Sequence, residues 1–297
     1  MTAPRVLAAT TAALVAAAVS VSVGSAQPGG HRAGGTVSVL YAGSLVDVME
    51  QQIGPAFSKA TGYGYEGFGA GSKAVAAEIK GRLKQGDVFI SASPAVNNTL
   101  MGAGNGAWVT WYGEFASSPL VIGYDPHSRF ASAFRTKRWW NVLQSKGFLL
   151  GRTDPAIDPK GQLTVQFLHR VELAKHLPGL ETRILGSVEN ASQIFPEETL
   201  LGRLQAGQLD AGFFYSIEAQ AAHLPTVNPP LGSHYSARYT ITILNNAPNP
   251  AGALAFVKYL LGPQGTGILK QDGFRLVKGE IGGIKTAVPA PVTALLG

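Results

Sequence analysis

The amino-acid sequence predicts an α/β fold, in which a mainly parallel sheet is flanked by helices. Composition is the first observation: the 297 residues include 37 glycines and 18 prolines, but only 14% are charged. These proportions argue against a helical bundle and against a disordered chain. The second observation is the order strand, loop, helix, strand along the chain, which is typical of parallel strands joined by crossover helices.

The first such unit begins at residue 37. The apolar run Val37–Tyr41 predicts a strand. Apolar residues three and four apart from Leu45 to Phe57 predict the helix that follows. Ser44 stands where an N-cap is expected, and Gly54-Pro55 should kink this helix without ending it.

The unit then repeats. Residues 63–68 predict a strand, residues 69–72 predict a tight loop, and Val75, Ile79 and Leu83 mark a helix that Gly86 ends. The remaining predicted strands are 87–92, 121–124, 148–151, 210–215 and 239–244, and the remaining predicted helices are 163–176, 196–205 and 250–261.

Two of the predicted strand-to-helix junctions carry a glycine followed by a serine, namely Gly43-Ser44 and Gly71-Ser72. A helix N-terminus presents unpaired N–H groups and a partial positive charge, so it binds anions. Serine adds a hydroxyl donor, and glycine lets the backbone approach closely. Either serine alone is more often a simple helix cap. Two such junctions at the carboxyl edge of one sheet favour an anion site.

Three segments carry a family resemblance: YAGSL at 41–45, AGS at 70–72 and DVFISA at 87–92. They resemble the periplasmic molybdate/tungstate-binding proteins, which are solute-binding components of ABC transporters, and in particular the branch of archaeal tungstate-binding proteins. The likeness extends over most of residues 37–277. Its later segments are 115–124, DPKG at 158–161, PEETLL at 196–201, 209–215 and 247–261.

The resemblance implies a two-lobe, type II periplasmic-binding-protein fold that closes on its ligand. Lobe 1 would comprise residues 37–118 and 239–297, and lobe 2 would comprise residues 119–238. The protein would be a monomer without a cofactor. It would capture molybdate or tungstate between the lobes and deliver this oxyanion to an ABC-type membrane permease.

The resemblance also implies the ligand-binding residues. Ser44 and Ser72 match two serines that donate hydrogen bonds to the oxyanion, and Tyr215 matches a donating tyrosine. Asp158 and Glu197 match an Asp and a Glu whose carboxylates approach the molybdenum or tungsten, although Glu198 is a neighbouring alternative. Taken alone, Asp158 reads as an ordinary turn residue, Glu197 as a helix-dipole partner and Tyr215 as a core residue.

The pair of acids bears on the choice of anion. Sulfate carries two charges and its sulfur adds no ligands, so a carboxylate should repel it. Phosphate keeps a proton that a carboxylate can accept, while hexavalent molybdenum and tungsten can add hard oxygen ligands. The acids therefore favour molybdate or tungstate and leave a receptor for phosphate or another oxyanion as an alternative. A secreted hydrolase that uses Asp158 and Glu197 as an acid pair is a third hypothesis.

No enzyme signature supports that third hypothesis. The sequence lacks a G-x-S-x-G elbow, a phosphate-binding G-x-x-x-x-G-K-[ST] loop and an H-E-x-x-H motif, and its six histidines are scattered singly. The net charge of +6 suits an anionic ligand. The basic residues at 137–138 do not continue into a stripe, so we expect no nucleic-acid partner.

The N-terminal segment predicts export. Arg5 precedes a long apolar run, and small residues end at Ala26, as in a cleaved signal peptide over residues 1–26. Residues 27–36 would form a linker, and an uncleaved membrane anchor is the alternative. The sequence contains no cysteine, so no lipid-modified cysteine is expected. The predicted location is the periplasm.

Overall fold

The computed structural model describes residues 34–296, which all belong to one compact unit. The predicted signal peptide and residues 27–33 of the predicted linker lie outside the described residues. Within the described part, none of the helices has the length and apolar character needed to cross a bilayer.

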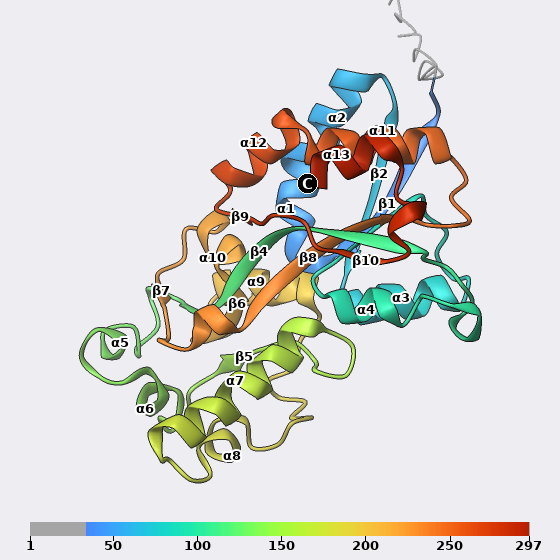
Figure 1. Cartoon of the computed structure of the whole chain (residues 1–297). Helices are drawn as coiled ribbons and strands as arrows, with labels where there is room; N and C mark the ends of the chain where they lie inside the picture. Colours follow the sequence, from blue (N-terminus) through green and yellow to red (C-terminus); the bar gives the residue numbers. More distant parts are fainter. Residues whose placement is uncertain (1–33, 297) are drawn as a thin grey trace, which may run out of the picture. The chain divides into compact units, whose positions relative to one another are not determined.

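Within residues 34–296, ten strands form one sheet, whose main path runs β2-β1-β3-β8-β4-β6-β5 (Figure 1). The short strands β7, β9 and β10 pair with β4. The strands are β1 (Thr36–Ala42), β2 (Gly64–Ala70), β3 (Val88–Ser91), β4 (Trp111–Tyr124), β5 (Leu150–Gly151), β6 (Ala211–Tyr215), β7 (Thr226–Val227), β8 (Ser236–Ile243), β9 (Arg275–Leu276) and β10 (Ile281–Gly283).

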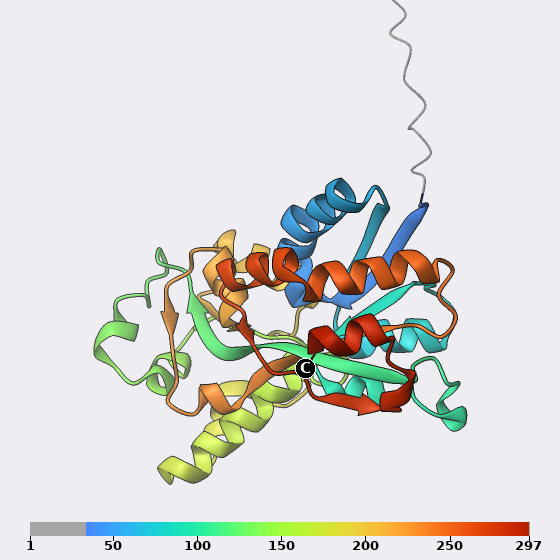
Figure 2. The same cartoon turned by 45° about the horizontal axis from the view of Figure 1, so that its top comes forward.

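The predicted α/β class is confirmed, and the sheet is mixed. Strand β1 pairs in parallel with β2 and β3, and β5 pairs in parallel with β6. Every pairing of β4 and β8 is antiparallel. These two strands run side by side through the middle of the sheet, as both views show (Figures 1 and 2).

Strand β4 is much longer than the sequence pattern predicted. It spans 14 residues, whereas the pattern predicted a strand only at 121–124. It crosses the proposed lobe boundary at residues 118 and 119, and β8 begins three residues before the proposed return to lobe 1. The division of the chain into two lobes stays a prediction.

The helices fall between these strands as the sequence order requires. The α-helices are α1 (Val46–Val48), α2 (Gly54–Thr61), α3 (Ser72–Lys80), α4 (Pro94–Asn98), α5 (Ala133–Thr136), α6 (Trp139–Leu143), α7 (Pro159–Lys175), α8 (Leu180–Leu185), α9 (Glu197–Gln205), α10 (Ser216–Ala221), α11 (Pro250–Leu261), α12 (Pro263–Gln271) and α13 (Ala290–Leu296). The 3₁₀ turns are η1 (Gly43–Leu45), η3 (Ala103–Asn105), η4 (Gly232–His234) and η5 (Lys285–Ala287), and η2 (Met49–Ile53) is a π-helical segment.

Two local expectations need correction. Ser44 does not cap its helix: the N-cap residue of η1 is Ala42, and no side chain caps this helix start. The helix does continue through Gly54-Pro55, as predicted. Helix α3 ends at Lys80, ahead of Gly86, because Arg82 adopts a left-handed backbone conformation with φ of 57°. Leu83 consequently lies outside the helix and is 77% exposed.

The core lies on both faces of the β1 end of the sheet. Successive side chains of a strand point to opposite faces. Val37 and Val39 of β1 therefore join the apolar cluster that contains Phe57 of α2, while Leu40 joins the cluster that contains Val75 of α3. In Figure 1, α2 and α11 cover one face and α3 and α4 cover the other. This packing fixes the carboxyl ends of β1 and β2, where η1 and α3 begin.

Candidate functional site

Asp158 immediately precedes helix α7 and does not sit in a free loop. Its Oδ1 atom accepts hydrogen bonds from the Thr153 hydroxyl at 2.6 Å and from the backbone N–H groups of Lys160 at 2.9 Å and Gly161 at 3.2 Å. It is thus the N-cap of a helix that starts at Pro159, not near residue 163. The second oxygen, Oδ2, is buried and has no hydrogen-bond partner in the described structure.

Glu197 is the first residue of helix α9 and is only 5% exposed. Neither of its carboxylate oxygens has a hydrogen-bond partner in the described structure. A Cβ atom at Gly43 would lie 2.8 Å from Oε2 of Glu197, so the glycine permits this close approach. Glu198 is exposed. Glu197 is therefore the acid that faces the interior.

Lys160 is fully buried in the first turn of α7. Its ammonium donates to Oε1 of Glu218 at 2.7 Å and lies 3.3 Å from Oε1 of Glu197. Burial lowers the pKa of Lys160, but the carboxylates of Glu218, Glu197 and Asp158 outweigh burial and raise this pKa above its ordinary value. The ammonium is thus charged at neutral pH.

The sequence reasoning gave Lys160 no role and missed Glu218. One signal was available, because a cation is unfavourable in the first turn of a helix unless it has a partner. Glu218 also accepts a hydrogen bond at Oε2 from the backbone N–H of Tyr215, at 2.7 Å. One carboxylate therefore fixes both the lysine and the start of helix α10.

The pKa of Glu197 is raised well above its ordinary value. Burial is the largest cause, and the negative charges of Asp158 and Glu218 add to it, while Lys160 acts in the opposite direction. Asp158, Lys160, Glu197 and Glu218 thus form one interacting group of buried ionisable side chains.

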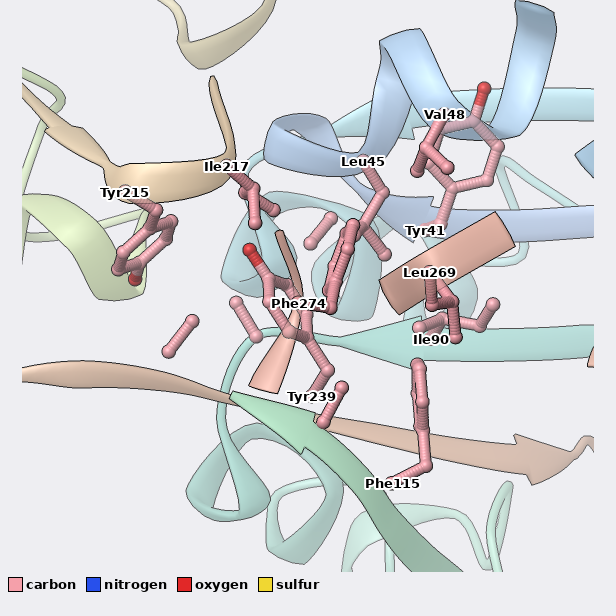
Figure 3. Packing of buried hydrophobic residues seen from close by; sticks show 14 of the residues in the cluster. Tyr41, Leu45, Val48, Ile90, Phe115, Tyr215, Ile217, Tyr239, Leu269 and Phe274 are labelled. Carbon is pink, nitrogen blue, oxygen red and sulfur yellow. The ribbon is translucent and has the colours of Figure 1, made fainter. Parts of the chain in front are cut away.

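Two tyrosines, Tyr215 and Tyr239, are buried close to these acids, whose charges act on both. Figure 3 shows the two rings among their buried neighbours. Their rings pack edge to face, with centroids 6.2 Å apart. The hydroxyl of Tyr215 is buried without a hydrogen-bond partner in the described structure, whereas the Tyr239 hydroxyl lies 3.0 Å from Oγ of Ser44. Burial is the main cause that raises the pKa of both tyrosines well above the ordinary value, so both remain protonated donors. The sequence reasoning missed Tyr239, which it counted only as part of a strand.

Ser72 is fully buried at the first position of α3. Its Oγ atom accepts a hydrogen bond from the backbone N–H of Ala92 at 3.0 Å, which leaves the hydroxyl proton for another acceptor. A Cβ atom at Gly71 would lie 3.2 Å from Oδ2 of Asp158. The start of α3 therefore adjoins the free oxygen of Asp158.

The structure brings the predicted site residues into one region. Gly43 contacts Glu197, Gly71 contacts Asp158, and both acids interact with Lys160. An open pocket reaches this region from the surface. Its lining residues include Gly43, Ser44, Glu197, Glu198, Glu218 and Phe274. Among residues 34–296, no group of three or more His, Cys, Asp or Glu side chains is arranged to hold a metal ion.

Comparison with known proteins defines the class. The profile of a family described as bacterial extracellular solute-binding proteins matches residues 37–275. This match covers most of the chain, so the chain belongs to that family of transport proteins.

Relatives within this class include molybdenum and tungsten binders. One relative is a protein of Haloferax volcanii that is provisionally named an ABC transporter molybdenum-binding protein. It is 30% identical over 227 residues, which cover 76% of this chain and 67% of the relative. The molybdate/tungstate-binding protein WtpA of Thermococcus kodakarensis is 24% identical over 56% of this chain and 60% of its own length. The periplasmic molybdate-binding protein of Azotobacter vinelandii has a similar fold, with a TM-score of 0.61, 21% identity and coverage of 81% of this chain and 99% of its own.

Proposed function

We propose that the chain captures molybdate or tungstate and delivers it to an ABC permease. One observation carries the proposal: Oδ2 of Asp158, both carboxylate oxygens of Glu197 and the hydroxyl of Tyr215 are buried without hydrogen-bond partners in the described structure. Buried polar atoms almost always have partners. A group of such atoms beside Ser72, whose hydroxyl proton is still available, supports a small polar ligand at this place.

The donors and acceptors of the site suit this cargo. Ser44, Ser72 and Tyr215 supply hydroxyl donors for the oxygens of a tetrahedral anion. Oδ2 of Asp158 and Oε2 of Glu197 supply hard oxygens for a hexavalent metal centre that adds ligands. The names of two relatives, which refer to molybdenum, molybdate and tungstate, give independent support.

Capture requires the site to open and close. Ser72, Lys160 and Tyr215 are inaccessible to solvent, and the open pocket does not extend to any of the three. The anion therefore reaches them only after neighbouring segments separate. Two contacts join α3 to the segment before α7 and would break in this motion: Lys73 Nζ donates to the Pro155 carbonyl at 2.9 Å, and Ala74 N donates to the Ile157 carbonyl at 3.1 Å. Closure then replaces the water around the anion with fixed donors.

Calorimetric titration of the purified protein tests the proposal. Molybdate, tungstate, sulfate and phosphate are the probes, and we expect molybdate or tungstate to bind with the highest affinity. Phosphate as the tightest ligand would instead favour the alternative, a receptor for phosphate, whose proton Oδ2 of Asp158 could accept. Absence of binding with all four anions would contradict both.

The same experiment addresses the hydrolase alternative. We propose that the chain is not an enzyme, because Oδ1 of Asp158 is committed to the cap of α7 and Glu197 is paired with Lys160. The bound anion should be recovered unchanged from the complex. Turnover of a chromogenic ester or glycoside, abolished by Glu197→Gln, would contradict this assignment.

We further propose that the mature protein acts in the periplasm as a monomer, after cleavage near Ala26. The extracellular character of the family supports export. Intact-mass measurement on protein from a cell-envelope fraction tests the cleavage, and a mass that includes residues 1–26 would contradict it. Light scattering tests the monomeric state.

A further inference from the structure

Lys160 lies at the centre of the buried charges, and the three donors of its ammonium are only partly used. Among the described residues, the carboxylate oxygens within 4 Å of Nζ belong to Glu218 and Glu197. A lysine ammonium has three N–H donors. The Glu218 bond is short, at 2.7 Å, whereas the Glu197 contact is an ion pair at 3.3 Å that leaves both oxygens of Glu197 without a hydrogen bond.

Acidic side chains outnumber basic ones in this group. Asp158, Glu197 and Glu218 are three acids, and Lys160 is the cation that pairs with two of them. An anion that enters among these acids is repelled by each ionised carboxylate, and a charge inside a protein acts far more strongly than it does in water. The site therefore needs a fixed positive charge close to the ligand.

We propose that the ammonium of Lys160 is that charge, and that Lys160 is a specificity-determining residue which lets a site with two carboxylates accept a doubly charged oxyanion. The inference rests on the proposed function and deepens it. Glu218 holds Nζ from one side. Nζ in turn draws Oε1 of Glu197 toward itself and leaves Oε2 beside Gly43, facing the place proposed for the anion.

Two substitutions of Lys160 separate an electrostatic role from a structural one. Lys160→Met removes the positive charge, and we expect the affinity for molybdate or tungstate to fall by about 10- to 100-fold, the scale for losing a hydrogen bond to a charged group. Lys160→Arg keeps the positive charge at this place. Its loss of affinity for the same anion should be smaller than that of Lys160→Met.

Lys175→Met is the matched control. Lys175 is exposed in the last turn of the same helix, α7, about 22 Å from Lys160 at 1.5 Å per residue. The Lys175→Met variant removes the same charge from the protein, but far from the site. Its affinity for molybdate and tungstate should therefore equal that of the wild type. Thermal unfolding of each ligand-free variant shows whether it is folded.

The outcomes are distinct. A purely structural role for Lys160 predicts that Lys160→Met and Lys160→Arg weaken binding alike, and that result would overturn the inference. Binding by Lys160→Met that equals binding by Lys175→Met would also overturn it, while the proposed function would stand. If Lys160→Met does not fold, Lys160→Arg decides alone, because a complete loss of binding by a folded variant that keeps the positive charge contradicts the role assigned to Lys160. A wild-type protein that binds no oxyanion would refute the proposed function itself.

Discussion

The two sides of the candidate site are held in place by different kinds of contact. The serine side, which comprises Gly43, Ser44, Gly71 and Ser72, follows the ends of β1 and β2 and contains no charge. Its hydroxyls are fixed by neutral hydrogen bonds to Tyr239 and to the backbone of Ala92. The acidic side, which comprises Asp158, Lys160, Glu197 and Glu218, is fixed by ion pairs and by the cap of α7.

This difference separates two tasks. The serine side presents donors whose positions depend on the sheet, so it suits any small oxyanion. The acidic side presents buried carboxylate oxygens that lack hydrogen-bond partners, which is unfavourable unless the ligand offers a proton or a metal centre. The serine side should therefore determine how tightly oxyanions in general bind, and the acidic side should determine which of them binds best.

Asp158→Asn should have the largest effect on ligand choice. Asparagine is an equally good N-cap, so the thermal stability of the ligand-free protein should change little. The variant loses the carboxylate beside Gly71, and the affinity for tungstate or molybdate should fall by roughly 1.5–3 kcal/mol. Titration with all four anions checks this. An equal loss for every anion would show that Asp158 does not discriminate among them.

Ser72→Ala should weaken both binding and folding. The affinity for all oxyanions should fall by roughly 1–3 kcal/mol, because one donor to a charged ligand is lost. The N–H of Ala92 also loses its acceptor, so chemical denaturation should show a lower free energy of unfolding. A loss confined to molybdate and tungstate would contradict the general role assigned to the serine side.

Ser44→Ala offers a narrower test of the same side. Its hydroxyl bonds to that of Tyr239, which can still donate to a ligand after the substitution. We expect a fall in affinity within the same range of roughly 1–3 kcal/mol, at the lower end. Tyr239→Phe provides the comparison, and a larger effect there than in Ser44→Ala would assign the donor role to the tyrosine.

Glu197→Gln should affect stability and binding in opposite directions. The pKa of Glu197 is raised by burial and by neighbouring acids, so the folded protein holds this proton more tightly than the unfolded chain does. Stability from this group is present at low pH and is lost as pH rises from the unfolded pKa through the raised folded pKa. Glutamine stays neutral, so the ligand-free variant should gain thermal stability relative to the wild type at pH 8 and not at pH 4.

The affinity of the Glu197→Gln variant for tungstate should nevertheless fall. A loss of stability at pH 8 that accompanies the loss of affinity would contradict the raised pKa of Glu197.

Local signals in the sequence were enough to predict much of this arrangement. At both junctions a strand, a glycine, a serine and a helix follow one another within a few residues. Ser44 and Ser72 could therefore be predicted as site residues from composition and spacing. The resemblance added Asp158, Glu197 and Tyr215, which read as ordinary residues when each is taken alone.

The contacts that complete the site depend on residues far apart in the chain. Lys160 and Glu218 are 58 positions apart, and Ser44 and Tyr239 are 195 positions apart. Neither contact can be predicted from a single sequence. Both depend on how β4, β6 and β8 pair in the sheet, which brings distant segments together. The same reason explains why Ser44 was wrongly assigned as a helix cap: its hydroxyl bonds to a strand that returns late in the chain.

A crystal structure of the protein grown with tungstate would test the central claim most directly, because tungsten scatters X-rays anomalously and can be located without bias. We predict one strong anomalous peak between the two sides and beside Oδ2 of Asp158, with oxygens of the tungstate within hydrogen-bond reach of the hydroxyls of Ser72 and Tyr215. A peak found only elsewhere, such as in the pocket lined by Arg82, Lys84 and Trp108, would contradict the account.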